Sequence, residues 1–251
     1  MKKKMYVLGV AALVAALLAM SGAAQSAMWV GAEIGGNFNP GGVNINASVL
    51  GLSGDIGSVN VKPSVIGGAT IGYDFVNAGF GAYAWPDWMK YFSFAMDFTY
   101  NRLSAHQGSG IFAALSPSAR VNGYEAALTF LFMAHYGFMP DSEVPSGRIN
   151  PYIGVGPAIV WTGIEGTHRT SAPGHPRTNN QRVFTSNFGD NAMNVALVIE
   201  PGIRWVCFQN VSIDTAMRYR LSQPSWSGDF VTVKANPLNQ LAFLVRANYH
   251  F

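Results

Sequence analysis

The chain has 251 residues, of which 49% are hydrophobic and only 12% are charged. Three of its 16 basic residues are Lys2, Lys3 and Lys4, and the other 13 are matched by 13 acidic residues. Beyond its first residues the chain therefore lacks the basic surface on which nucleic-acid binding depends. A single cysteine, Cys207, excludes an internal disulfide framework.

Residues 1–27 are predicted to form a secretory signal peptide. Three lysines precede an apolar run from Val7 to Met20, and small residues follow from Ser21 to Ala27. The run is shorter than the roughly 20 residues of a membrane-spanning helix, and no charged stop signal follows it. We therefore exclude this segment from the fold and expect residues 28–251 to form one domain.

The rest of the chain is predicted to form β-strands. In Tyr91–Arg102, apolar side chains take every second position and polar ones lie between them, which is typical of a strand with one apolar face. The same alternation predicts eight strands: Trp29–Phe38, Ser64–Phe75, Tyr91–Arg102, Asn122–His135, Tyr152–Thr162, Met193–Trp205, Val211–Arg220 and Leu238–Phe251. Strands of about ten residues are long enough to cross a bilayer at a tilt. We predict an all-β fold, an eight-stranded antiparallel up-and-down transmembrane β-barrel.

The predicted connections alternate between long and short. The long ones, rich in residues that favour irregular backbone, are Asn39–Pro63, Leu103–Val121, Gly163–Ala192 and Ser222–Pro237. The short ones are Val76–Lys90, Gly137–Pro151 and Val206–Asn210. This asymmetry is typical of bacterial outer-membrane barrels, with long loops outside the cell and both termini in the periplasm.

Aromatic residues are expected to form two girdles, one at each membrane interface. The residues near the predicted periplasmic rim are Trp29, Phe75, Tyr91, Phe92, Tyr136, Tyr152, Trp205, Tyr249 and Phe251, and those near the other rim are Tyr100, Tyr124, Trp161 and Tyr219. The segment Trp85–Tyr91 is predicted to form either a helical turn that begins at Pro86 or a plain aromatic turn.

The polar faces of the strands carry charges of both signs. The acids are Glu33, Asp74, Asp97, Glu125, Glu200 and Asp214, and the arginines are Arg204, Arg218, Arg220 and Arg246. An eight-stranded barrel is just wide enough for its own side chains to fill. These residues are therefore expected to form ion pairs in the lumen, either as a plug that stabilises the barrel or as a gate on a narrow path for small solutes.

Two prolines, Pro157 and Pro201, fall inside neighbouring predicted strands at the same distance from the periplasmic rim. Because proline lacks a backbone donor, both are expected to weaken the seam between these strands. The result would be either a pair of bulges or a lateral portal for an apolar solute.

One long loop carries Arg169, Arg177 and Arg182. Arginine binds phosphate with two parallel hydrogen bonds, so lipopolysaccharide is a possible ligand for this loop. The alternative is a solvated loop without a specific partner.

Several segments resemble one family of membrane proteins. They are PYIGVGPAI at Pro151–Ile159, the hairpin from EPGIRW to QNVSIDTAMRYR at Glu200–Arg220, and the terminal NYHF. With the leader and the eight amphipathic strands, they resemble the OmpA-like and OmpW-like superfamily of small outer-membrane β-barrels. The resemblance covers the whole mature chain, and it implies an integral outer-membrane protein with a structural or surface role, or with passage of small solutes.

The resemblance also implies partners. Outer-membrane lipid and lipopolysaccharide would surround the barrel, and periplasmic chaperones and the barrel-assembly machinery would act during its biogenesis. The aromatic end of the last strand, Tyr249 and Phe251, resembles the signal that this machinery reads.

No catalytic residue, cofactor or metal site is predicted. Some small outer-membrane barrels modify lipid A with histidine, serine and a carboxylate, so a lipid A modifying enzyme is the alternative function. The loop histidines are His106, His168 and His175, and Glu165 precedes His168 by three residues. Sequence neighbours in a loop do not supply the fixed geometry of a triad, and no further residue has the spacing of a metal ligand.

Overall fold

The computed structural model describes residues 28–40, 43–49, 52–75, 85–107, 120–172, 182–223, 225–227, 231–235 and 238–251. Side chains are described in these ranges except at 43–60, 105–107, 120–121, 164–172, 182–190, 225–227 and 231–235. The predicted signal peptide lies outside the described residues and stays a prediction.

The strands are β1 (Met28–Phe38), β2 (Val43–Val49), β3 (Leu52–Val61), β4 (Ser64–Asp74), β5 (Phe92–Gln107), β6 (Arg120–His135), β7 (Ile149–Ala172), β8 (Arg182–Phe208), β9 (Val211–Ser222), β10 (Ser225–Ser227), β11 (Val231–Ala235) and β12 (Leu238–His250). A short 3-10 helix, η1 (Asp87–Tyr91), lies between β4 and β5. No helix in the described part of the chain is long and apolar enough to cross a membrane.

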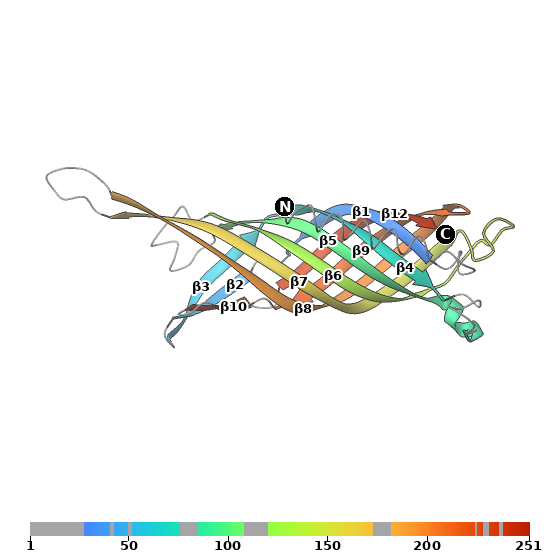
Figure 1. Ribbon diagram of the computed structural model, residues 1–251, viewed down its shortest axis with the longest axis horizontal. Helices are drawn as coiled ribbons and strands as arrows, with labels where there is room; N and C mark the ends of the chain where they lie inside the picture. The colour runs from blue at the N-terminus through green and yellow to red at the C-terminus, as the bar shows by residue number, and fades with distance from the viewer. Residues whose placement is uncertain are drawn as a thin grey trace, which may run out of the picture.

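Eight of the strands close into one antiparallel barrel, as predicted. Their order around the barrel is β5-β4-β1-β12-β9-β8-β7-β6, and β6 pairs again with β5. The first strand, β1, pairs with the last, β12, and places Glu33 opposite Arg246. Figure 1 shows the tilted strands wrapping around the long axis of the molecule. Closure gives each of these strands two neighbours, so the barrel has no open edge.

Side chains alternate across the barrel wall as the period-two pattern predicts. On β9, every second residue from Ser212 to Ser222 is buried, and the residues between them are exposed. The exposed positions of the wall carry large apolar residues, among them Val65 and Val195, which are 71% and 72% exposed. A soluble protein would bury such residues, so an apolar belt around the whole wall indicates a surface that faces lipid.

One end of the barrel, which we call the turn end, carries η1, the turn at Gln209–Asn210 and the final residue Phe251. The residue before η1 is Pro86, so the predicted helical turn is confirmed. The backbone N–H of Phe251 donates to the carbonyl of Met28 at 3.0 Å, which fixes the end of the chain to β1.

The connection between β6 and β7 at the turn end is also ordered. Arg148 forms ion pairs with Asp141 and Glu143. Hydrogen bonds from the backbone N–H of Val144 and from the Arg148 side chain hold the pKa of the Asp141 carboxyl below its usual range. The N–H of Val206 donates to the carbonyl of Arg148 at 2.8 Å, which holds this turn against β8.

Aromatic pairs mark both rims of the apolar belt. At the turn end, Tyr91 stacks on Tyr136 with 5.7 Å between ring centroids. Toward the opposite end, Tyr100 stacks on Tyr124 with 6.1 Å between centroids. These pairs occupy the levels predicted for the two girdles.

The opposite end, which we call the extended end, differs from the prediction. All four predicted long loops contain strand residues: β2 and β3 lie within 39–63, β5 and β6 extend into 103–121, β7 and β8 extend into 163–192, and β10 and β11 lie within 222–237. The sheet continues as β10-β11-β2-β3-β5, so the added strands are built onto the barrel wall. Figure 1 shows β7 and β8 reaching far beyond the other barrel strands at this end. With 24 and 27 residues, they are more than twice as long as a bilayer requires, which is about 9–11 residues.

The two prolines do not weaken one shared seam, so that prediction is wrong. The pairing of β7 with β8 is continuous, with Pro157 opposite Leu197 and Pro201 opposite Ile153. The strand pairing is interrupted on the other side of each strand. The pairing of β6 with β7 has a gap beside Pro157, and the pairing of β8 with β9 has a gap beside Pro201. Each proline thus turns its missing donor away from the β7–β8 seam, and neither gap carries a register shift.

Candidate functional site in the barrel lumen

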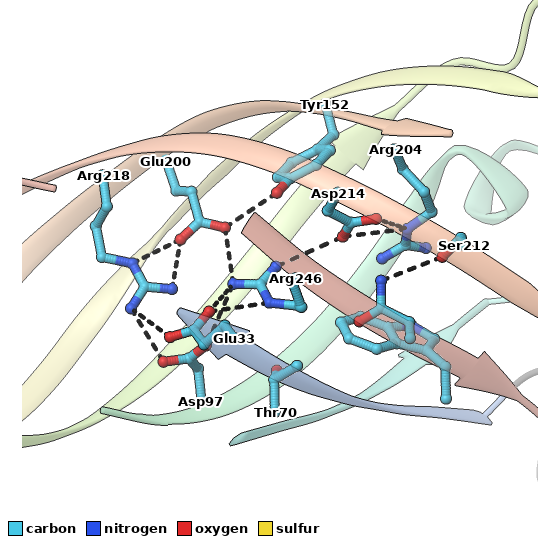
Figure 2. A network of polar contacts seen from close by, with 12 residues as sticks. Glu33, Thr70, Asp97, Tyr152, Glu200, Arg204, Ser212, Asp214, Arg218 and Arg246 are labelled. Carbon is cyan, nitrogen blue, oxygen red and sulfur yellow. Dashed lines mark hydrogen bonds and ion pairs between the residues drawn. The ribbon is translucent and has the colours of Figure 1, made fainter. Parts of the chain in front are cut away.

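The centre of the lumen holds two arginines and three carboxylates. Arg218 and Arg246 lie among Glu33, Asp97 and Glu200, as Figure 2 shows, and the side chains of all five are at most 2% exposed. Arg218 Nη1 is 3.0 Å from Asp97 Oδ1, and its Nη2 is 2.5 Å from Glu200 Oε2. Arg246 Nη2 is 2.7 Å from Glu33 Oε2 and 3.2 Å from Asp97 Oδ2. Each arginine therefore bridges carboxylates that come from different strands.

Part of this network follows from the pairing of neighbouring strands. Arg246 on β12 lies directly opposite Glu33 on β1 and opposite Asp214 on β9. The contact between Arg218 and Asp97 is different, because β9 and β5 are separated by β12, β1 and β4 around the barrel. This ion pair therefore crosses the lumen.

A second group of residues extends toward the turn end. Arg204 Nε is 3.2 Å from Asp214 Oδ1, and its Nη1 is 3.5 Å from Asp74 Oδ1. The Arg204 guanidinium lies 4.5 Å from the centroid of the Trp29 ring, whose Nε1 donates to Asp74 at 3.3 Å. An ion pair of 3.6 Å between Arg246 and Asp214 joins this group to the centre.

A third group lies toward the extended end. Arg220 Nη1 is 2.7 Å from Glu125 Oε1, and its Nη2 donates to Thr99 Oγ1 at 3.3 Å. Gln240 Nε2 donates to the second carboxylate oxygen of Glu125 at 2.7 Å. The polar network thus extends from the turn end, through the centre, toward the extended end.

All of the predicted lumen charges take part in ion pairs: Glu33, Asp74, Asp97, Glu125, Glu200, Arg204, Asp214, Arg218, Arg220 and Arg246. Six carboxylates face four guanidinium groups, so the network has an excess of acids. A cavity of about 10 Å³ beside Arg204 and Tyr152 has room for about one water molecule. Side chains fill the lumen here.

Trp29 and Tyr152, which we expected in the aromatic girdle, lie inside the lumen instead. Trp29 is 0% exposed, and Tyr152 is 7% exposed with its hydroxyl donating to Glu200 Oε1 at 3.1 Å. The alternation itself contains the signal for this, because Val30 and Ile153 face outward and their neighbours must face inward. The girdle prediction was wrong for these two residues because it relied on their aromatic type and not on the face of the strand that they occupy.

A serine and a histidine meet at the turn end, where Ser212 Oγ is 2.9 Å from His250 Nε2. A triad also needs a carboxylate that orients the histidine. No carboxylate among the described residues bonds to the His250 ring, and the carboxylates of Asp74 and Asp214 form ion pairs with Arg204. The described residues also contain no group of three histidine, cysteine, aspartate or glutamate side chains that could hold a metal ion.

The loop residues considered for lipopolysaccharide binding or catalysis remain predictions. Arg177 and His175 lie outside the described residues. Arg169 and His168 lie in β7, Arg182 lies in β8 and His106 lies in β5, at positions where the side chains are not described.

Comparison with known proteins identifies the class of fold. No protein-family model matches the chain, and no curated protein matches it in sequence. Among solved structures, the outer membrane protein OprG from Pseudomonas aeruginosa superposes with a TM-score of 0.54, at 9% identity, over 90% of this chain and 97% of that chain. The chain has the fold of a small outer-membrane β-barrel.

Two further outer-membrane barrels match more loosely. Neisserial surface protein A has a TM-score of 0.42 at 12% identity, over 89% of this chain and 97% of that chain. The outer membrane protein AlkL, solved in lipid bilayers, has a TM-score of 0.41 at 15% identity, over 92% of this chain and 93% of that chain. The assignment of this outer-membrane barrel fold rests on OprG and on the closed antiparallel sheet.

Proposed function

We propose that this chain is an integral protein of the bacterial outer membrane with a structural or surface role, and that its lumen is closed to free diffusion. The observation that carries the proposal is the burial of Arg218 and Arg246, whose side chains are 1% and 2% exposed at the centre of the lumen. Charged groups that line an open pore would be hydrated. Here their charges are satisfied by carboxylates from across the barrel, as expected of a plug.

Passage of small solutes would require this network to rearrange. Removing a guanidinium from a buried carboxylate leaves both charges without a partner, which costs several kcal/mol, on the order of 3–5. We therefore expect liposomes that contain the purified protein to swell in small neutral sugars no faster than liposomes without it. Swelling that increases with the amount of folded protein would support the narrow-channel alternative.

We also infer that the protein is not an enzyme. The support is the absence, among the described residues, of a carboxylate that would orient His250 toward Ser212. Mass spectrometry of lipid A from cells with and without the protein tests this inference. Identical acylation patterns are expected, and a change that disappears in a Ser212→Ala variant would identify a lipid A modifying enzyme.

The proposed orientation places the extended end outside the cell and the turn end in the periplasm, with both termini periplasmic. Support comes from the even number of barrel strands and from the length of β7 and β8, since long connections of outer-membrane barrels lie outside. Lipid and lipopolysaccharide would then contact the apolar belt. Arg169, Arg177 and Arg182 would lie on the outer side, where lipopolysaccharide phosphates are accessible.

Deletion of Phe251 is expected to reduce assembly into the outer membrane. Tyr249 and Phe251 are in edge contact, with 5.3 Å between ring centroids, and end the last strand as a pair that we propose the barrel-assembly machinery and its chaperones recognise. The measurement is the fraction of heat-modifiable, folded barrel in outer-membrane preparations of the wild type, the deletion variant and a Phe251→Tyr control. The control should assemble normally, and normal assembly of the deletion variant would refute the proposed signal.

A further inference from the structure

The outer wall of the barrel carries a groove beside the break between β3 and β4. It has a volume of about 550 Å³ and is lined mainly by Pro63, Val65, Gly67, Tyr100, Arg102 and Ser104. Val65 and Tyr100 are 71% and 46% exposed, so the groove faces the surroundings of the barrel and not its lumen. Its volume is in the range of sites that bind small organic ligands, about 300–1,000 Å³.

A glycine leaves room for this groove. Gly67 lies opposite Tyr100 across the β4–β5 pair, and the Tyr100 ring stacks on Tyr124 on the other side of β5. On the other side of Gly67, Ile34 of β1 lies opposite this glycine and is 62% exposed on the outer wall. The apolar belt is therefore interrupted by a depression that an acyl chain could fill.

The rim of the groove toward the extended end is cationic. Arg102 lies two residues beyond Tyr100 on the same face, is exposed, and makes no ion pair with any side chain that the structure describes. Lys62 is exposed beside Pro63, and its backbone N–H donates to the carbonyl of Ser104 at 2.9 Å.

Neither Arg102 nor Lys62 is paired with an acid whose side chain the structure describes. The acids outside the lumen whose side chains are described are Asp87 in η1 and Asp141 and Glu143 in the β6–β7 turn, all at the turn end. The acids on the strands of the extended end, whose side chains are not described, are Asp55, Glu165 and Asp190. The groove thus combines an apolar floor with two exposed cationic side chains at one end.

We propose that this groove binds a phosphorylated glycolipid of the lipid A class, with an acyl chain over Gly67 and a phosphate on Arg102. The guanidinium offers phosphate two parallel hydrogen bonds, and the apolar floor favours a hydrocarbon chain. The proposal rests on the proposed function, because the orientation given there places Arg102 at the outer leaflet. It names a site on the barrel wall that is separate from the three loop arginines.

Native mass spectrometry of the folded protein in detergent micelles tests the site, with diphosphoryl lipid A, dephosphorylated lipid A and phosphatidylglycerol as probes. The variant Arg102→Gln removes the charge, and Gly67→Leu fills the groove. A Cβ on Gly67 meets only the Glu33 carbonyl oxygen, at 3.7 Å, so the barrel accommodates this substitution. The matched control is Ala69→Leu, on the same strand and outer face but outside the groove.

Each of the two site variants is expected to weaken binding of diphosphoryl lipid A about tenfold, as loss of one charge-assisted hydrogen bond or a few buried methylenes predicts. The control should bind like the wild type, and the other two probes should bind more weakly. Equal binding of phosphatidylglycerol, or unchanged binding by both site variants, would overturn the proposal. Heat-modifiable gel mobility of the same samples tests barrel formation separately, so the lipid site can fail while the proposed barrel stands.

Discussion

Replacing Arg246 by alanine is expected to lower the free energy of unfolding by about 3–5 kcal/mol. This guanidinium contacts Glu33, Asp97 and Glu200 at 2.7, 3.2 and 3.3 Å, and none of these carboxylates has access to water. Its removal leaves excess buried negative charge, which costs more than the lost contacts alone. The measurement is urea unfolding of the protein in lipid vesicles, followed by tryptophan fluorescence.

A matched control is available on the outer wall. Arg102→Ala removes an arginine that is exposed and forms no ion pair with any side chain that the structure describes, so its unfolding curve should superpose on that of the wild type. An Arg246→Ala midpoint that also matches the wild type would show that the central ion pairs contribute nothing to stability. The unfolding midpoint of Arg246→Lys should lie between those of Arg246→Ala and the wild type, because lysine keeps the charge but cannot bridge several carboxylates in one plane.

Replacing Gly72 by valine is expected to have a comparable effect through packing, about 3 kcal/mol. A Cβ at position 72 would lie 2.2 Å from Cε2 of the Trp29 ring, which is fully buried. The ring cannot stay in place, and its displacement also breaks its hydrogen bond to Asp74 and its contact with Arg204. The fraction of heat-modifiable barrel after refolding and the near-ultraviolet circular dichroism of tryptophan report this change.

The same substitution at Gly67 is the matched control, because this residue lies on the same strand with its Cβ direction outward and unobstructed. Gly67→Val should refold like the wild type, which would separate the clash with Trp29 from any general effect of valine in β4. Normal refolding and an unchanged tryptophan spectrum in Gly72→Val would contradict the placement of Trp29 inside the lumen.

The barrel strands could be predicted because one face of each strand meets lipid and the other meets a filled lumen. Alternation on β5, with Phe94, Met96 and Phe98 outward and Asp97 inward, is a direct consequence of these two environments. The strands at the extended end carry no such signal. The β7 residues beyond Thr162 and the β8 residues before Ala192 lie past the apolar belt, so no lipid selects alternating residues there. Glycine and asparagine in this part of the sequence suggested a loop.

The composition of the lumen was predictable, but most of its pairs were not. Glu33 with Arg246 follows from closure of β1 on β12, which any barrel of these strands requires. Arg218 with Asp97 depends on the tilt and stagger that bring two distant strands to the same height, and alternation contains no information about either. The proline positions failed as predictors for a related reason, since alternation does not tell on which side of a strand a missing donor falls.

Planar-bilayer recording of the purified wild-type protein at neutral pH tests most directly whether the ion-pair network closes the lumen. The Arg218→Ala, Arg246→Ala double variant is the positive control. It leaves acids in excess and should conduct cations in preference to anions, because rings of acidic residues select cations. The wild type is expected to show no discrete openings under conditions in which the double variant conducts. Stepwise openings of the wild type at the same protein density would contradict a closed lumen.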